Sequence, residues 1–223
     1  MSNLDYTVEI LEKENPTHDV VRFVLERPQG FEFTPGQAIE VNIAGKDGLE
    51  DSPFTLTGLP NIDNLELILK VYPSHQGTTL ALSELETGDK LNITKPFDTF
   101  KYKTPGIFIA GGTGITPFVA ILRQLNQDGK LDGNKLIFAN KKDEDIFLSD
   151  ELRRYLGDNL TMILSKEDHE AYFHGRVDKD FLEEHFSIDN QQFYMCGPDG
   201  FSESIKGQLM DLGVDENKIM VEY

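Results

Sequence analysis

The sequence predicts an antiparallel β-barrel followed by an α/β domain with a doubly wound parallel sheet. Residues 1–100 show short hydrophobic stretches that alternate with polar residues and are broken by Pro, Gly, Asn and Asp. From residue 104 onward, apolar strands alternate with amphipathic helices, which is typical of a parallel sheet. We place the border near Lys103–Gly106, so that the two expected domains are residues 1–103 and 104–223.

The first domain is expected to contain six short strands and one helix. The strands are predicted at residues 6–10, 20–25, 38–43, 54–56, 65–71 and 90–93. Their number and spacing indicate a six-stranded antiparallel barrel. The helix is expected to be capped by Thr79, to bury Leu82 and Leu85, and to end at Gly88.

The second domain is expected to alternate five strands with four helices. The strands are predicted at residues 107–110, 136–139, 160–164, 193–195 and 219–221. Apolar residues at i, i+3, i+4 and i+7 predict the first helix, from Phe118 to Leu125. Ser149 is expected to cap the second helix, which Gly157 follows, and residues 178–186 and 199–212 predict the last two.

The charge of the chain excludes several classes of partner. The formal net charge is −18, with 17 acidic and 9 basic residues in 1–103 and 22 acidic and 12 basic residues in 104–223. The acidity is therefore spread over both halves and is not confined to a tail. Such a surface repels nucleic acid and anionic membranes, so no nucleic-acid partner is expected. Solubility alone also explains an acidic surface.

The single cysteine and the scattered histidines argue against a metal site. Cys196 is the only cysteine, so an internal disulfide and a four-thiolate site are excluded within these residues. No metal-ligand spacing relates the five histidines, His18, His75, His169, His174 and His185. No apolar run reaches the length of a membrane span, and residues 1–5 lack a signal pattern. We therefore expect a soluble cytoplasmic protein.

The strongest local motif is Ile107-Phe-Ile-Ala-Gly-Gly-Thr-Gly-Ile-Thr-Pro117. An apolar strand enters a glycine turn that leads directly into a helix, where Thr116 suits the N-cap and Pro117 the first helical position. Free N–H groups and the helix dipole then favour an anion such as a pyrophosphate. The alternative is a glycine turn that serves only tight packing.

An ordered set of motifs resembles the ferredoxin–NADP⁺ reductase superfamily. Gly111-Gly-Thr-Gly-Ile-Thr-Pro117 and Cys196-Gly-Pro198 resemble its nucleotide-binding elements. In the first half, Phe33-Thr-Pro-Gly-Gln37, Ser52-Pro-Phe-Thr55 and Gly77-Thr-Thr79 resemble its flavin-domain elements, in the same order. The resemblance implies a flavin-binding barrel and an NAD(P)-binding α/β domain, in which hydride passes from the nicotinamide to flavin N5.

The resemblance also implies site residues. FAD, with FMN as the alternative, is expected to contact Ser52, Pro53, Phe54, Thr55, Lys70, Val71, Tyr72, His75, Gly77, Thr78 and Thr79. NADPH or NADH is expected at Gly112, Thr113, Gly114, Thr116, Cys196, Gly197 and Pro198. Catalytic roles are implied for Thr55 at flavin N5, Cys196 beside the nicotinamide, Glu222 as a proton relay and the terminal aromatic Tyr223.

The chain departs from the family pattern at several positions. Ser52 stands where the family has a flavin-phosphate Arg, and Phe54 where it has Tyr. Glu222 and Tyr223 are adjacent, whereas the family usually separates the two by one residue. Lys141, Lys166 and Arg176 occupy positions where NADPH-preferring members carry Arg, and they favour NADPH over NADH.

These observations predict a flavin-dependent oxidoreductase that passes electrons from NAD(P)H to a carrier such as flavodoxin or ferredoxin. Two alternatives stay open. The chain could be the reductase component of an oxygenase or a general flavin or ferric reductase. It could also be a non-catalytic nucleotide-sensing module that has lost its flavin, which the absence of the family Arg at Ser52 favours.

Overall fold

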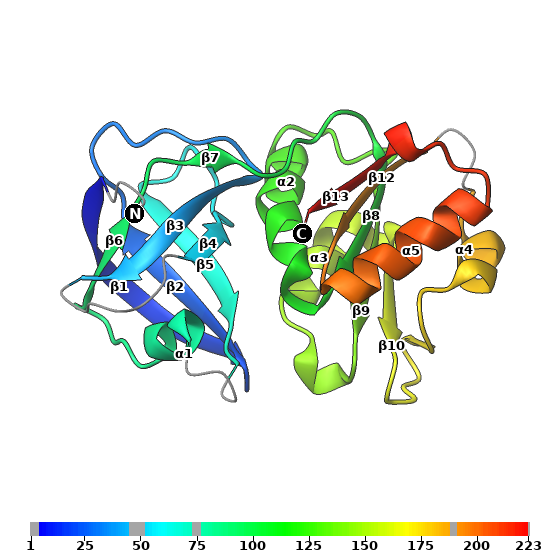
Figure 1. Ribbon diagram of the computed structural model, residues 1–223, viewed down its shortest axis with the longest axis horizontal. Coiled ribbons are helices and arrows are strands. Elements are labelled where there is room, and N and C mark those ends of the chain that lie inside the picture. Colours follow the sequence, from blue (N-terminus) through cyan, green and yellow to red (C-terminus); the bar gives the residue numbers. More distant parts are fainter. Residues whose placement is uncertain (1–4, 45–51, 73–76, 188–190, 223) are drawn as a thin grey trace. The chain divides into compact units, whose positions relative to one another are not determined.

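The computed structural model describes residues 5–44, 52–72, 77–187 and 191–222. The chain forms two compact units (Figure 1). The first comprises Met1–Tyr102 together with Thr116–Gln124, and the second comprises Lys103–Ile115 with Leu125–Tyr223. The chain therefore returns to the first unit for most of one helix after it has entered the second.

The first unit is built on an antiparallel sheet that closes on itself. Its strands are β1 (Tyr6–Thr17), β2 (Val20–Glu26), β3 (Gln37–Ile43), β4 (Ser52–Thr55), β5 (Asn64–Lys70) and β6 (Lys90–Ile93). They follow the order β4-β3-β6-β1-β2-β5, and a bridge between Leu56 and Leu67 joins the two ends. The predicted six-stranded barrel is thereby confirmed, with a two-residue strand β7 (Phe97–Asp98) added beside β3.

Strand β1 is much longer than the stretch that its alternation predicts. Its first residues, Tyr6–Glu9, pair with β6, and the remainder pairs with β2 through two register shifts. The segment Leu11–Pro16 is largely exposed, so it carries no hydrophobic alternation that a sequence pattern could detect. The inward side chains of the barrel, such as Phe23, Leu25, Ile39 and Leu67, are fully buried and form one apolar core.

The helix of the barrel begins earlier than its sequence signals indicate. Helix α1 spans Thr78–Ser83 with Gly77 at the N-cap, so Thr79 lies inside the first turn and does not cap the helix. The expected cap at Thr79 is wrong because glycine itself takes the extended N-cap conformation here. Leu82 is buried as expected, but the helix ends at Ser83, so the predicted end at Gly88 is wrong; Gly88 forms a separate turn with φ +95°.

Residues 116–124 of helix α2 (Thr116–Gln127) belong to the first unit. Phe118 packs edge-on against Phe100, with ring centroids 5.2 Å apart. Gly36 has φ +93°, and a Cβ there would lie 3.4 Å from Ile121 and collide with the Phe100 carbonyl. The glycine of the Phe-Thr-Pro-Gly-Gln element therefore permits close packing beneath this helix.

The second unit contains a six-stranded, entirely parallel sheet in the order β11-β10-β9-β8-β12-β13. Its strands are β8 (Gly106–Gly111), β9 (Lys135–Asn140), β10 (Leu160–Leu164), β11 (Phe173–His174), β12 (Gln192–Cys196) and β13 (Ile219–Glu222). Five of them match the predicted positions, and the doubly wound sheet is confirmed. The short edge strand β11 has no apolar run that would predict it.

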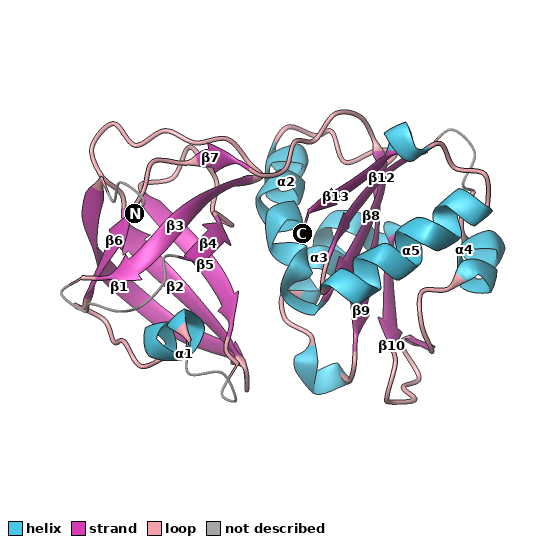
Figure 2. Cartoon of the chain, in the orientation of Figure 1, coloured by secondary structure: helices cyan, strands magenta, loops and turns pink. Residues whose placement is uncertain are grey.

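Helices lie on both sides of this sheet (Figure 2). Helices α4 (Lys179–His185) and α5 (Asp199–Asp211) cover one face through buried residues such as Leu182 and Leu209. Helix α3 (Ser149–Leu156) starts after Leu148, whose φ is +59°, so Ser149 is the first helical residue and not the cap. The longest described helix, α5, has 13 residues and is too short to cross a bilayer.

The strand order reverses direction beside β8. The chain runs from β8 outward through β9, β10 and β11, and then returns to place β12 on the other side of β8. In open α/β sheets, ligands bind outside the carboxyl ends of the strands at such a switch point. The turns that follow β8 and β12 are therefore the expected ligand-binding edge of this unit.

Tyr194 of β12 anchors the start of the second unit, and its removal provides a test of this packing. Its ring stacks on Phe108, and its hydroxyl accepts from the Lys103 and Thr104 N–H groups at 3.0 Å and donates to the Thr104 carbonyl at 2.8 Å. We expect Tyr194→Phe to lower the free energy of unfolding by about 1–3 kcal/mol in urea denaturation, because three backbone groups lose a partner. Tyr6→Phe, which keeps its ring contact with Phe31, should change stability by less than about 0.5 kcal/mol; equal effects would contradict the anchoring role.

Candidate nucleotide and flavin sites

The turns after β8 and β12 pack backbone against backbone. Gly114 lies in the 3₁₀ turn η1 (Gly112–Ile115), and a Cβ at Gly114 would collide with the Cys196 carbonyl and lie 2.6 Å from the Gly197 nitrogen. A Cβ at Gly197 would lie 2.7 Å from the Phe201 ring. Tight packing thus explains Gly114 and Gly197 directly, and it brings the two motifs of the sequence to one place.

Gly112 has a different reason to be glycine. Its φ is +56°, and a Cβ there would meet no atom within 4 Å. The open space beside a left-handed backbone leaves room for a ligand at the switch point. Turn η1 runs directly into α2, so the helix begins one residue earlier than predicted: Thr116 is its first residue and not the N-cap, and Pro117 is its second. Thr113 is half-buried in the same turn.

Cys196 ends β12 in register with Glu222 on β13. Burial and the neighbouring Glu222 carboxylate raise the pKa of the Cys196 thiol to about 12. The thiol therefore stays protonated at physiological pH and does not act as a nucleophile. Gly197 and Pro198 follow, and Pro198 stands at the N-cap of α5. The structure thus brings the predicted residues Gly112, Gly114, Cys196 and Gly197 together at one edge of the sheet.

Asn140, which ends β9 next to β8, carries no sequence signal of a binding residue. Its side chain is 7% exposed, and within the described residues its Nδ2 atom is buried without a hydrogen-bond partner. A buried amide group of this kind costs free energy unless it is hydrogen-bonded. Asn140 lies at the carboxyl edge of the sheet, where a nucleotide hydroxyl or phosphate could accept this hydrogen bond. The buried donor and the open Gly112 turn therefore fit a bound nucleotide.

A charged pocket of about 320 Å³ lies beyond the ends of β9 and β10. It is lined by Lys142, Asp143, Glu144, Lys166 and Glu167. Lys142 pairs with Glu144 at 2.9 Å, and the Glu167 carboxylate accepts from the Asp143 N–H at 2.9 Å. Of the three predicted phosphate-binding cations, Lys166 lines this pocket, whereas Lys141 and Arg176 do not line it and are exposed. Three carboxylates thus share the pocket with two lysines.

The predicted flavin residues of β4 lie at one end of the barrel sheet. Thr55 is 9% exposed and pairs with Ala38, while Phe54 is half-buried, pairs with Ile39 and packs against the barrel core. Ser52 is half-buried and Pro53 is exposed on the same strand. An aromatic ring beside a largely buried hydroxyl fits the ring system of a flavin.

The other predicted flavin contacts are divided between β5 and α1. Lys70 at the end of β5 forms an ion pair with Asp19 at 2.6 Å, so its charge is already balanced by a carboxylate. Val71 is buried and Tyr72 is 46% exposed. Gly77 and Thr78 begin α1, followed by Thr79, and a Cβ at Gly77 would meet open space. His75 and Tyr223 lie outside the described residues.

Comparisons with known proteins match each half of the chain to a domain family. A model of the oxidoreductase FAD-binding domain matches residues 7–102, and a model of the oxidoreductase NAD-binding domain matches residues 108–207. Together they cover most of the chain and occur in the order that the sequence predicts. FAD-binding and NAD-binding domains are thereby confirmed.

Similar proteins are reductases of several kinds. The chain is 26% identical to the reductase component of propane 2-monooxygenase from Mycolicibacterium goodii, over 98% of this chain and 67% of that protein. It is 29% identical to NADH-cytochrome b5 reductase 2 from Mycosarcoma maydis, over 92% of this chain and 66% of that protein. The chain therefore spans about two thirds of the length of these relatives. The crystal structure of a ferredoxin NADP⁺ reductase from Neisseria gonorrhoeae with bound FAD and NADP has the same fold, with a TM-score of 0.84, 18% identity and 97% of each chain covered.

The close packing at Gly114 generates a testable prediction. We expect Gly114→Ala to weaken the binding of NAD(P)⁺ at least about tenfold, because the added methyl group forces the two turns apart at the ligand edge. The flavin content should stay unchanged, because the methyl group lies in the second unit. Isothermal titration calorimetry and flavin absorbance measure the two effects.

Gly207→Ala is the matched control. Gly207 lies in the middle of α5, its added Cβ would meet no atom within 4 Å, and its φ is not positive. Alanine favours the helix there, so this variant should bind NAD(P)⁺ as the wild type does. Normal nucleotide affinity in Gly114→Ala would show that the turns tolerate separation.

Proposed function

Because the chain belongs to the ferredoxin–NADP⁺ reductase superfamily, we propose that it is an NAD(P)H-dependent flavoprotein reductase that supplies electrons to a separate acceptor. The observation that carries this proposal is the junction of the Gly112–Gly114 turn with Cys196–Gly197 at the switch point of the parallel sheet. It supplies an anion-binding turn and a small neutral thiol side by side, on a chain that also contains an FAD-binding barrel.

The residues of this chain serve binding and orientation. FAD, when bound, supplies the chemistry that takes up hydride from a nicotinamide and releases electrons to an acceptor. Thr55 is proposed to hold a hydrogen bond at flavin N5, and Phe54 to pack on the ring. The protonated thiol of Cys196 offers a compact, polarisable surface for the nicotinamide ring. Glu222, beside it on β13, is proposed to relay protons.

The electron acceptor is proposed to be a separate redox protein. One cysteine cannot ligate an iron–sulfur cluster through four thiolates, so these 223 residues do not supply such a relay. A ferredoxin or flavodoxin suits this reaction, and so does the oxygenase of a system like that of the propane 2-monooxygenase reductase. Relatives named as reductases favour a catalytic chain over a nucleotide-sensing module.

The charged pocket favours NADH over NADPH, whereas Lys141, Lys166 and Arg176 taken from the sequence alone favour NADPH. In dinucleotide-binding sheets, an acidic residue after the second strand binds the ribose 2′-hydroxyl, whereas cations accept the 2′-phosphate of NADPH. The pocket follows the second strand of the unit, β9, and holds Asp143, Glu144 and Glu167. Three carboxylates share the pocket with two lysines, and Lys142 is already paired with Glu144, so a 2′-phosphate would be repelled.

Flavin content and reduction kinetics test the proposed function. We expect the purified protein to bind one FAD per chain and to be reduced by NADH in stopped-flow absorbance measurements. Thr55→Ala should slow flavin reduction at saturating nucleotide by about tenfold or more while the nucleotide dissociation constant changes little, because the lost hydrogen bond acts at the reacting atom. Thr7→Ala removes an exposed barrel hydroxyl, and in this variant NADH should reduce the bound flavin at the wild-type rate.

Two results would overturn the proposal. The first is a colourless protein that neither FAD nor FMN reconstitutes. The second is a flavoprotein that neither nucleotide reduces. Turnover with ferredoxin, flavodoxin and free riboflavin as acceptors then separates carrier reductases from general flavin reductases.

Nucleotide preference is tested by reversing one charge in the pocket. Glu144→Lys should raise the NADPH/NADH ratio of kcat/KM about tenfold or more, because it adds a cation and releases Lys142 from its ion pair. Glu183→Lys on α4 makes the same charge change away from the pocket and should shift the ratio less than about twofold. A wild-type enzyme that already prefers NADPH would contradict this assignment.

A further inference from the structure

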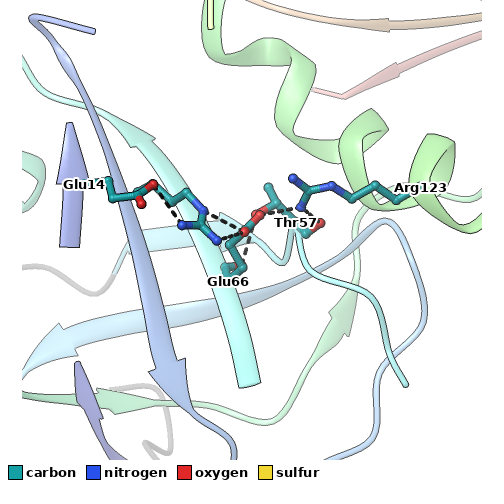
Figure 3. A network of polar contacts seen from close by, with 5 residues as sticks. Glu14, Thr57, Glu66 and Arg123 are labelled. Atoms are coloured by element: carbon teal, nitrogen blue, oxygen red, sulfur yellow. Dashed lines mark hydrogen bonds and ion pairs between the residues drawn. The ribbon is translucent and has the colours of Figure 1, made fainter. Parts of the chain in front are cut away.

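A buried carboxylate lies between two arginines in the first unit. Glu66 of β5 is 6% exposed, and its two oxygens face Arg22 of β2 and Arg123 of α2. Figure 3 shows Glu66 at the centre of this network, with Thr57 and Arg123 to one side and Glu14 to the other. All of these residues belong to the same compact unit.

The network has a solvent side and a helix side. On the solvent side, Arg22 donates from Nε and Nη2 to Glu66 Oε2 at 2.7 Å and from Nη1 to the exposed Glu14 at 2.9 Å. On the helix side, one nitrogen of Arg123, Nη1, donates both to Glu66 Oε1 and to the Thr57 carbonyl, the latter at 2.8 Å. Thr57 Oγ1 also donates to Glu66 Oε1, at 2.7 Å.

These contacts keep Glu66 ionised despite its burial. Burial alone raises the pKa of a carboxyl group, but the Arg123 guanidinium, the hydrogen bonds from Arg123 and Thr57, and Arg22 together hold the pKa of Glu66 below its usual range. The ion pairs therefore persist at physiological pH. Because every hydrogen bond is directional, the network specifies where Arg123 and the Thr57 backbone lie relative to each other.

The two partners of the helix-side contact, Thr57 and Arg123, each lie on a chain segment that adjoins a proposed binding element. Thr57 is two residues after Thr55, and the bridge between Leu56 and Leu67 lies between Thr57 and the end of β4. Arg123 belongs to α2, whose first residue follows the η1 turn without a break. Arg123 is thus the side chain that ties the proposed flavin strand to the helix that emerges from the nucleotide turn.

Stability alone is a weak reason for such a network. A buried ion pair costs much desolvation, and well-packed apolar residues often stabilise a fold as well or better. What apolar residues do not provide is a fixed hydrogen-bonding geometry. Hydride transfer depends steeply on the placement of donor and acceptor, so a small displacement lowers its rate strongly.

We propose that Arg123, through Glu66 and the Thr57 carbonyl, is a positioning residue for hydride transfer; this inference rests on the proposed reductase function. It holds the flavin strand and the helix of the nucleotide turn in one fixed arrangement. It touches neither cofactor in this role, so its loss should affect the reduction step more than the binding of either cofactor.

The test compares Arg123→Met with Arg22→Met in the flavin-loaded enzyme. Each substitution removes one of the two arginines from Glu66, but only the first breaks the contact between α2 and Thr57. Flavin occupancy, thermal stability, the NAD⁺ dissociation constant and the stopped-flow rate constant of flavin reduction at saturating NADH are measured for both. The charge-transfer absorbance between flavin and nicotinamide reports their relative placement directly.

We expect Arg123→Met to lower the reduction rate constant at least tenfold and to weaken the charge-transfer band, with NAD⁺ affinity within threefold of the wild type. Arg22→Met should be destabilised to a similar extent yet reduce within twofold of the wild-type rate. Arg123→Lys keeps the positive charge but lacks the planar guanidinium group, so it should recover part of the reduction rate. It also provides the test if Arg123→Met does not fold.

A wild-type reduction rate in a folded Arg123 variant would overturn the inference. Equal slowing in Arg123→Met and Arg22→Met, or slowing that matches the loss of bound flavin, would also overturn it, since the network would then be structural only. Absence of flavin reduction in the wild-type protein would instead overturn the proposed function and, with it, this inference.

Discussion

The close approach of two turns at the carboxyl edge of the parallel sheet is the constraint on which the second unit depends. Strands β8 and β12 are neighbours although more than 80 residues separate them in the chain, and their following turns meet where Gly114 faces the Cys196–Gly197 backbone. Side chains larger than hydrogen would separate the turns, so this edge is made largely of backbone. Such an edge presents N–H groups to an anion without placing charged side chains around it.

Much of this arrangement could be predicted, because hydrophobic periodicity and glycine positions are local signals. The strand predicted at 160–164 matches β10, and the other four parallel strands differ only by a residue at one or both ends. The predicted N-caps of two helices are wrong because residues without a capping side chain occupy those positions. Gly77 and Leu148 take the N-cap positions of α1 and α3, so Thr79 and Ser149 are helical residues although both are common cap types.

The features that could not be predicted depend on contacts between distant segments. In Leu65-Glu66-Leu67 the alternation alone indicates an exposed carboxylate, yet Arg123 and Arg22 enclose it from elements 57 and 44 residues away. Likewise, Lys166 suggests a phosphate site until Glu144 and Glu167 are found to line the same pocket. Asn140 gave no sequence signal, because a polar residue at a strand end is common and its buried amide is visible only in the fold.

The two units therefore fix their proposed sites by different physical means, and both resist changes of pH. The turn of the second unit relies on backbone packing beside Cys196, whose pKa of about 12 keeps it neutral. The first unit relies on Glu66, whose pKa is lowered in the folded state. A lowered carboxyl pKa stabilises the fold above the unfolded-state pKa, and this contribution is lost only as the pH falls through the folded-state value. Near neutral pH neither group changes its charge, so the geometry of both sites is insensitive to proton uptake there. Glu222, the proposed proton relay, pairs in register with Cys196 at the end of β13, and its Oε2 atom is buried there.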